Sequence, residues 1–170
     1  SLVGSEMCIR DSIKAMTPEK FTEVAMPYYK KVFGDKQMPY EKFAAILQKR
    51  TTQLTQIPEM LDFFAELPSY TKELFVNKKS KTNLENSPVV LKEAYDRLKA
   101  MPEWNETSIH DCLINMAVEK ELKNGTVMWP VRIAAAGKTV TPGGAVEILD
   151  ILGRDESLAR LEKGMAILAE

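Results

Sequence analysis

The feature that most constrains this chain is a helical repeat of apolar residues that runs from Ile13 almost to the end. Within residues 18–33, for example, apolar side chains recur every three or four positions, which places them on one face of a helix. Thr17-Pro18-Glu19 is a typical helix start and Gly34 a typical helix end. No pair of alternating segments predicts paired strands. The pattern therefore predicts an all-α fold.

The same reasoning predicts helices along the rest of the chain. We expect them at residues 40–54, 58–67, 89–101 and 108–122, with a short ordered piece at 72–75. Thr107 or Asn105 is expected to cap the helix at 108–122, and Asn124-Gly125 is expected to end it. Val, Trp and Ile in residues 127–137 favour a strand, but the three alanines favour a short helix closed by Gly137.

Two further helices are expected near the C-terminus. Thr141-Pro142 is predicted to open one that includes residues 143–152 and ends at Gly153. Asp155 is predicted to cap the last, at residues 156–168. The stretch at residues 70–86 loses the helical period, gathers Lys78, Lys79 and Lys81, and is interpreted as a connector. We therefore expect two small helical bundles in tandem, residues 13–84 and 85–170, after a leader at residues 1–12.

Composition excludes several classes of function. No apolar run approaches the length of a membrane span, and residues 1–12 lack the apolar centre of a secretory signal. Two cysteines make no disulfide framework, so a cytoplasmic location is expected. One histidine and no cysteine cluster predict no metal site. A net charge of −1 argues against a nucleic-acid coating over the whole surface but allows a local basic surface.

A search for catalytic groups finds no credible active site. His110, Asp111 and Cys112 are adjacent, but side chains of neighbouring helical residues are expected to point apart, so a structural role is favoured for His110 and Cys112. What remains are positive and aromatic groups near predicted turns. They are Lys49, Arg50, Lys78, Lys79, Lys81, Trp129, Arg132 and Lys138. Arginine can stack on a base and bond its edge, so these groups point to RNA as one partner, with a solubilising role as the alternative.

The last third of the chain resembles the C-terminal end of bacterial glutamyl-tRNA synthetases. The matching pieces are Pro130-Val131-Arg132-Ile133-Ala134, Gly137, Thr141-Pro142-Gly143, Ile151-Leu152-Gly153 and Arg160-Leu161. The resemblance continues upstream through residues 102–104, 62–64, Arg50 with Leu54, and 13–21. Residues 1–12 have no counterpart in the family. We interpret them as a non-native scar or disordered leader, which removes Cys8 from the chemistry.

The resemblance implies that this chain is the anticodon-binding, all-helical part of such a synthetase. By that resemblance, Arg50 contacts the third anticodon base, Arg132 the first, and Thr141 and Pro142 form the turn that receives the first and middle bases. Gly144 stands where the family often has leucine, which puts an apolar base contact in doubt. Lys49, Lys78, Lys79, Lys81 and Lys138 are candidate contacts to the RNA backbone.

The resemblance also implies partners and cofactors. The parent enzyme would join glutamate to tRNA(Glu) with ATP and Mg²⁺, whereas this chain would bind tRNA as a monomer without catalytic residue, cofactor, DNA or membrane. Whether tRNA(Gln) is a second substrate stays open, although Arg50 favours discrimination. Two alternatives also stay open: a non-catalytic helical module that binds another protein, and a freestanding enzyme.

Overall fold

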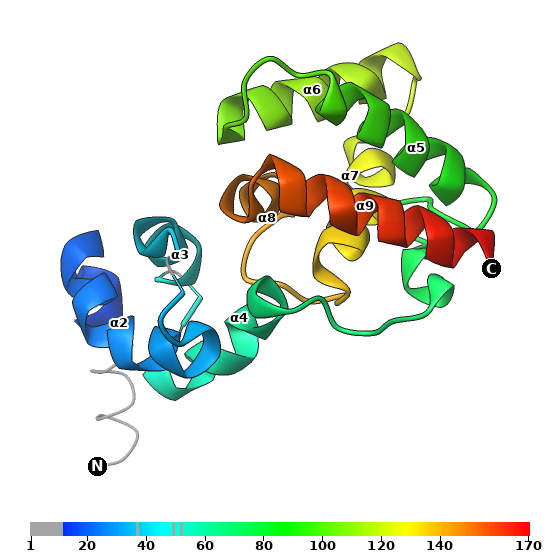
Figure 1. Cartoon of the computed structure of the whole chain (residues 1–170). Helices are drawn as coiled ribbons and strands as arrows, with labels where there is room; N and C mark the ends of the chain where they lie inside the picture. Colours follow the sequence, from blue (N-terminus) through cyan, green and yellow to red (C-terminus); the bar gives the residue numbers. More distant parts are fainter. Residues whose placement is uncertain (1–11, 37, 49, 52) are drawn as a thin grey trace. The chain divides into compact units, whose positions relative to one another are not determined.

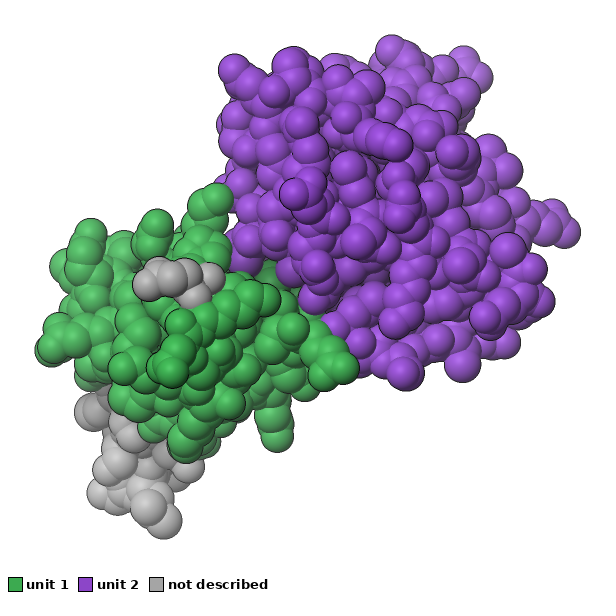
Figure 2. Space-filling view, in the orientation of Figure 1, with its two compact units in different colours: residues 1–66 green, residues 67–170 purple. Residues whose placement is uncertain are grey.

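A computed structural model describes residues 12–36, 38–48, 50–51 and 53–170. Packing divides the chain into two compact units, Ser1–Glu66 and Leu67–Glu170 (Figure 2). The described residues form helices joined by turns, together with one isolated β-bridge. The predicted all-α class is therefore confirmed. Residues 1–11 of the predicted leader, Cys8 among them, lie outside the described residues.

The first unit is built around an aromatic core. Its elements are α2 (Pro18–Phe33), α3 (Tyr40–Leu47), the 3-10 helix η1 (Leu54–Gln56) and α4 (Ile57–Ala65) (Figure 1). Thr17 caps α2 as expected, because its hydroxyl accepts from the amide of Lys20. The ring of Phe43 stacks on Phe33 at 5.4 Å between centroids and meets Phe64 edge-on at 5.2 Å. These contacts hold α2, α3 and α4 together.

In the second unit, four helices pack around one buried central helix. It contains η2 (Lys72–Phe75), α5 (Asn86–Lys99), α6 (Glu106–Glu119), α7 (Asn124–Ala136), α8 (Ala145–Leu152) and α9 (Arg154–Ala169). Helix α7 packs against α5, α6, α8 and α9 (Figure 1). The last four residues of α7, Ile133–Ala136, are all buried. The segment predicted as ambiguous between strand and helix is thus a helix, and Gly137 closes it in the left-handed conformation with φ +66°.

Small residues let α9 approach α7 closely. A Cβ atom placed on Gly164 of α9 would lie 2.8 Å from the Cβ of Ala134 and 3.2 Å from a methyl carbon of Leu91. Real Cβ contacts are essentially never as short as the first of these, so no larger residue fits without a shift of backbone. The contact fixes the distance between α7 and α9.

Several predicted helix boundaries are wrong. Helix α3 ends at Leu47 rather than at 54, and Thr51, which follows it, is buried and outside the helix. Helix α6 ends at Glu119, since Glu121 takes a positive φ of 56°. Asn124-Gly125 begins α7 instead of ending α6: Lys123 takes the N-cap position with extended backbone, and Asn124 is the first helical residue.

The C-terminal helix starts also differ from those predicted. Helix α8 begins at Ala145, because the chain bends at Pro142 and Gly143 before it and the Thr141 hydroxyl donates to the carbonyl of Gly143. Helix α9 begins at Arg154 with Gly153 at its cap position, so Asp155 lies in the first turn instead. An acid there still favours the helix through its dipole. By contrast, Asn105 caps α6 as expected and accepts from the amide of Ser108.

The predicted connector is an ordered part of the second unit. Asn77 and Thr82 form an antiparallel bridge, and the Thr82 hydroxyl donates to the carbonyl of Phe75. The carbonyl of Ser80 accepts from the Thr126 hydroxyl, which ties the segment to α7. Packing therefore divides the chain after residue 66, whereas the sequence led us to expect a division after residue 84. The difference arises because these polar contacts leave no periodic trace in the sequence.

Substitution of Gly164 by valine should destabilise the protein by roughly 2–3 kcal/mol, because the added carbons overlap Ala134 and Leu91. Urea unfolding followed by circular dichroism measures the change. Ala166→Val, on the exposed side of the same helix, is the matched control and should cost less than about 1 kcal/mol. Equal losses in the two variants would contradict the packing argument.

Candidate functional site

The residues expected to contact RNA lie in both units. Arg50 follows α3 in the first unit, is exposed, and donates its amide to the carbonyl of Leu47. Lys49 lies outside the described residues. Arg132, Thr141, Pro142, Gly144, Lys138 and the three lysines at 78, 79 and 81 all lie in the second unit.

The first unit has a hollow of about 610 Å³, and one of the residues that line it, Gln48, comes two positions before Arg50 in the sequence. Lys14, Met16, Ala44, Ala45 and Gln48 line it. The amide Nε2 of Gln48 donates to the carbonyl of Ile13 at 2.8 Å, which joins the chain before α2 to the end of α3. This bond orders the backbone two residues before Arg50.

Arg132 is held by the loop between α7 and α8. Its Nη1 donates to the Thr141 hydroxyl at 2.9 Å, and its Nη2 donates to the carbonyl of Thr139 at 2.8 Å. The guanidinium carbon lies 4.7 Å from the ring centroid of Trp129, one turn earlier on α7. The Thr141 hydroxyl in turn donates to the carbonyl of Gly143. The sequence-predicted residues Arg132 and Thr141 thus act as one unit that shapes the loop.

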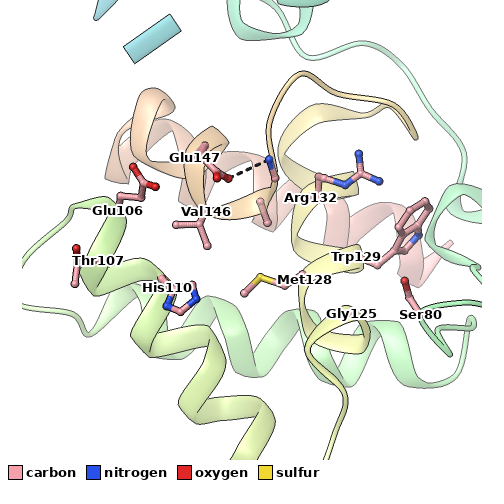
Figure 3. A pocket seen from close by; sticks show the side chains of 12 residues that line it. Ser80, Glu106, Thr107, His110, Gly125, Met128, Trp129, Arg132, Val146 and Glu147 are labelled. Atoms are coloured by element: carbon pink, nitrogen blue, oxygen red, sulfur yellow. Dashed lines mark hydrogen bonds between the residues drawn. The ribbon is translucent and has the colours of Figure 1, made fainter. Parts of the chain in front are cut away.

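Pro142 and Gly144 complete this loop. Thr141 and Pro142 are buried, whereas Gly144 is exposed. The amide of Gly144 donates to Oε2 of Glu147 at 3.0 Å (Figure 3). A Cβ atom at Gly144 would also lie 3.0 Å from that oxygen. Glu147 therefore occupies the space beside Gly144 and satisfies an amide at the start of α8.

A pocket of about 710 Å³ lies between α6, α7 and the start of α8, and we call it the α6–α8 pocket. Figure 3 shows Glu106, Thr107 and His110 of α6 on one side and residues of α7 on the other. The remaining lining residues are Ser80, Gly125, Met128, Trp129, Arg132, Gly144, Ala145, Val146 and Glu147. Arg132 and Gly144, which the sequence predicts as site residues, thus line the same pocket as three residues of α6. The sequence does not predict these three, Glu106, Thr107 and His110, as contacts to RNA.

The lysine-bearing turn stands beside this pocket. Lys78, Lys79 and Lys81 are exposed, while Ser80 between them lines the pocket. The turn is closed by Asn77, whose Oδ1 accepts from the amide of Ser80 at 2.9 Å. Lys81 has a positive φ of 57°, and its carbonyl accepts from Nδ2 of Asn86. Three ammonium groups are thus carried by an ordered turn at the edge of the pocket.

His110, Asp111 and Cys112 are adjacent on α6, and the directions of their side chains differ in part from the prediction. His110 is exposed and lines the pocket, and its Nδ1 lies 3.5 Å from Oδ1 of Asp111. The expectation that these neighbours point apart is therefore wrong. Cys112 is half-buried, and burial raises the pKa of its thiol, which makes it a poor nucleophile at neutral pH.

Neither a metal-binding cluster nor a membrane-spanning helix is present in the part of the chain that the structure describes. Among these residues no three His, Cys, Asp or Glu side chains gather in a group that could hold a metal ion. None of the helices described is both long and apolar enough to cross a membrane.

Comparison with known proteins gives a consistent result. A family profile described as "Anticodon binding domain" matches residues 20–165. The chain is 46% identical to a glutamate–tRNA ligase of Clostridium kluyveri over 153 residues, and 45% identical to that of Clostridium tetani over the same length. Each alignment covers 90% of this chain and 31% of the relative. The chain thus spans about a third of the length of these relatives.

Solved structures show the same fold. The crystal structure of a glutamate tRNA ligase from Elizabethkingia meningosepticum superposes with a TM-score of 0.78 at 20% identity. The match covers 99% of this chain and 33% of that one. The glutamate–tRNA synthetase of Elizabethkingia anophelis gives a TM-score of 0.74 at 19% identity, over 98% of this chain and 32% of that one.

Thr141→Val should destabilise the protein by about 1–3 kcal/mol, because valine keeps the shape but removes the bonds to Arg132 and Gly143. Urea unfolding measures the effect. Thr139→Val is the matched control: that side chain is exposed and only its carbonyl meets Arg132, so the change should stay within about 0.5 kcal/mol. A neutral Thr141→Val would show that the loop does not depend on this bond.

Proposed function

This chain belongs to the anticodon-binding domain family, and on that premise we propose that it binds tRNA(Glu) for a glutamate–tRNA ligase. The observation that carries the proposal is the similarity to clostridial ligases over 90% of the chain. The parent enzyme would activate glutamate with ATP and Mg²⁺ and transfer it to tRNA in the cytoplasm. Those cofactors belong to the remainder of such a ligase, and this chain would act as a monomer that recruits and checks the tRNA.

Arg50 is proposed to discriminate the third anticodon base. It is exposed, and the backbone beside it is held by the bonds to Leu47 and by the Gln48 amide. A guanidinium offers a planar pair of donors that can meet two acceptors on one base edge. An ordered backbone reduces the entropy lost when such a contact forms.

Arg132 is proposed to meet the first anticodon base, and Thr141 and Pro142 are proposed to form the turn that receives the first and middle bases. Since Nη1 and Nη2 of Arg132 already bond the loop, we assign Arg132 chiefly the task of keeping that loop in shape. Pro142 is buried, which holds its part of the loop in place, whereas Gly144 is exposed to solvent. Base selection would then depend on the shape of the loop and on the groups across the pocket.

The lysine turn is proposed to bind the RNA backbone. Its three ammonium groups are exposed on an ordered turn beside the α6–α8 pocket, where phosphates of an inserted nucleotide would pass. Lys138 is half-buried just after α7 and is proposed as a further phosphate contact. Contacts of this kind position RNA without selecting its sequence.

Alanine at Arg50 should reduce the preference for the cognate third anticodon base by about 1–3 kcal/mol. Calorimetric titration with anticodon stem-loops that differ only at that base measures the preference. Arg50→Lys keeps the charge but not the planar fork, so it should lose selectivity while retaining most of the affinity. If Arg50→Ala weakens both loops equally, Arg50 is only a phosphate contact.

The proposal as a whole is tested by titrating the chain with tRNA(Glu) at several salt concentrations. Binding should be saturable and salt-sensitive. Alanine at Lys78, Lys79 and Lys81 together should lower the log–log salt slope by about 2, because each neutralised phosphate contributes roughly 0.7 to 0.9. Alanine at Lys20, Lys30 and Lys31 of α2 is the charge-matched control and should change the slope less.

Two results would contradict the proposal at different levels. The absence of saturable binding to tRNA(Glu) would favour a module that binds another protein. An unchanged slope in the triple variant of the lysine turn would remove only that turn from the interface. A parallel titration with tRNA(Gln) tests whether the first tRNA is preferred.

A further inference from the structure

We propose that Glu106 of α6 is a specificity-determining residue, which accepts a hydrogen bond from an N–H group on the edge of an anticodon base held in the α6–α8 pocket. The inference rests on the proposed tRNA binding and adds a residue on the wall across from Arg132. It follows from the arrangement in Figure 3.

The pocket has the size and lining that suit an unstacked base. Its volume of about 710 Å³ falls within the usual range for sites that bind small organic groups. Met128 and Val146 supply apolar surface between the helices, and Trp129 supplies an aromatic one (Figure 3). Bases of single-stranded loops are bound by such surfaces together with polar groups at the base edge.

The polar groups of the α7 and α8 walls are already engaged within the protein. Arg132 bonds the Thr141 hydroxyl and the Thr139 carbonyl, and it stacks against Trp129. The carboxylate of Glu147 accepts from the amide of Gly144. Rearranging either group to meet a base would cost an existing bond.

Glu106 differs from Arg132 and Glu147 in its interactions within the protein. Its side chain is exposed, belongs to the first turn of α6 and lines the pocket (Figure 3), and within the described part of the chain it has no hydrogen bond or ion pair. A carboxylate is therefore presented to the pocket without a protein donor. His110, one turn later on α6, borders the same side. A base that brings an N–H group to this wall would satisfy Glu106 with no internal bond broken.

The chemistry of a carboxylate determines what it selects. An ionised carboxylate only accepts hydrogen bonds, so it favours the N3–H of uracil or the amino group of cytosine. A base carbonyl at the same place would be repelled. Glu106 would thus distinguish the edges of bases that are similar in size, which the apolar surfaces of Met128 and Val146 cannot do.

Glu106 also has a structural role that the test must separate. An acidic residue in the first turn stabilises a helix through its dipole. That role affects folding but does not depend on the chemical edge of a bound base. A readout that couples the side chain to one atom of the RNA therefore distinguishes the two roles.

The experiment is a double-mutant cycle between the full chain and an anticodon stem-loop with the anticodon UUC. Calorimetry measures affinity for the plain loop and for loops with N3-methyluridine at the first or the second anticodon position. N3-methylation removes the N–H donor. The wild type should bind one methylated loop about 10-fold more weakly than the plain loop, and Glu106→Ala should lose most of that difference.

Conservative and control variants complete the design. Glu106→Gln keeps an acceptor oxygen without the charge. The logarithm of the affinity ratio between the plain and the methylated loop should therefore be smaller in this variant than in the wild type, but more than half of the wild-type value. This variant also serves as the test if Glu106→Ala does not fold, as judged by circular dichroism. A preference unchanged from the wild type in Glu106→Gln would then overturn the proposal. Glu103→Ala removes an exposed carboxylate just before α6 and outside the pocket lining, and it should behave as the wild type.

The outcomes separate the two proposals. A coupling of about 5-fold or more between Glu106 and one N3–H group supports the inference. A smaller coupling at both positions, with normal binding of the plain loop, overturns the role of Glu106 and leaves tRNA binding intact. If the wild-type chain binds neither the plain loop nor whole tRNA(Glu), both proposals fail.

Discussion

The interaction on which the second unit depends is the contact of buried Arg160 with the end of α7. Arg160 is 3% exposed; its Nη1 donates to the carbonyl of Ala135 at 2.6 Å and its Nε to Glu156 at 2.8 Å. The cation therefore satisfies a carbonyl at the negative end of α7, while Glu156 balances its charge. Together with the close approach at Gly164, this contact fixes the position of the C-terminal end of α7 against α9. The loop that carries Thr141 and Gly144 starts from that end.

The candidate site is consequently a property of the packing between helices rather than of one motif. Arg132 and Trp129 come from α7, Gly144 from the loop before α8, and Glu106 from α6. Trp129 also donates from its indole nitrogen to the carbonyl of Leu74 at 2.9 Å, which joins α7 to the segment before the lysine turn. An ordered frame of this kind can present groups to RNA in one arrangement and so lower the entropy lost on binding.

Sequence reasoning found the helices, but it placed several of their ends incorrectly. Periodicity reports which face of a helix is apolar, whereas the ends at Leu47 and Glu119 depend on local backbone geometry. For the candidate site, a resemblance proposed Arg132 and Thr141, whereas their mutual hydrogen bond could not be predicted from the sequence. The sequence did not single out Glu106, which lines the pocket, because a lone acid at a helix start is, in a sequence, indistinguishable from one that only favours the helix dipole.

By itself, the sequence determined the all-α class, most of the helices, and the membership suggested by the run from Pro130 to Gly153, because these depend on local periodicity and on residue order. Only the tertiary structure decided that the segment at 77–82 belongs to the second unit and that α6, α7 and α8 enclose a pocket. The physical reason is that both depend on contacts between residues far apart in the chain. Such contacts are set by helix packing and by single hydrogen bonds, neither of which repeats along a sequence.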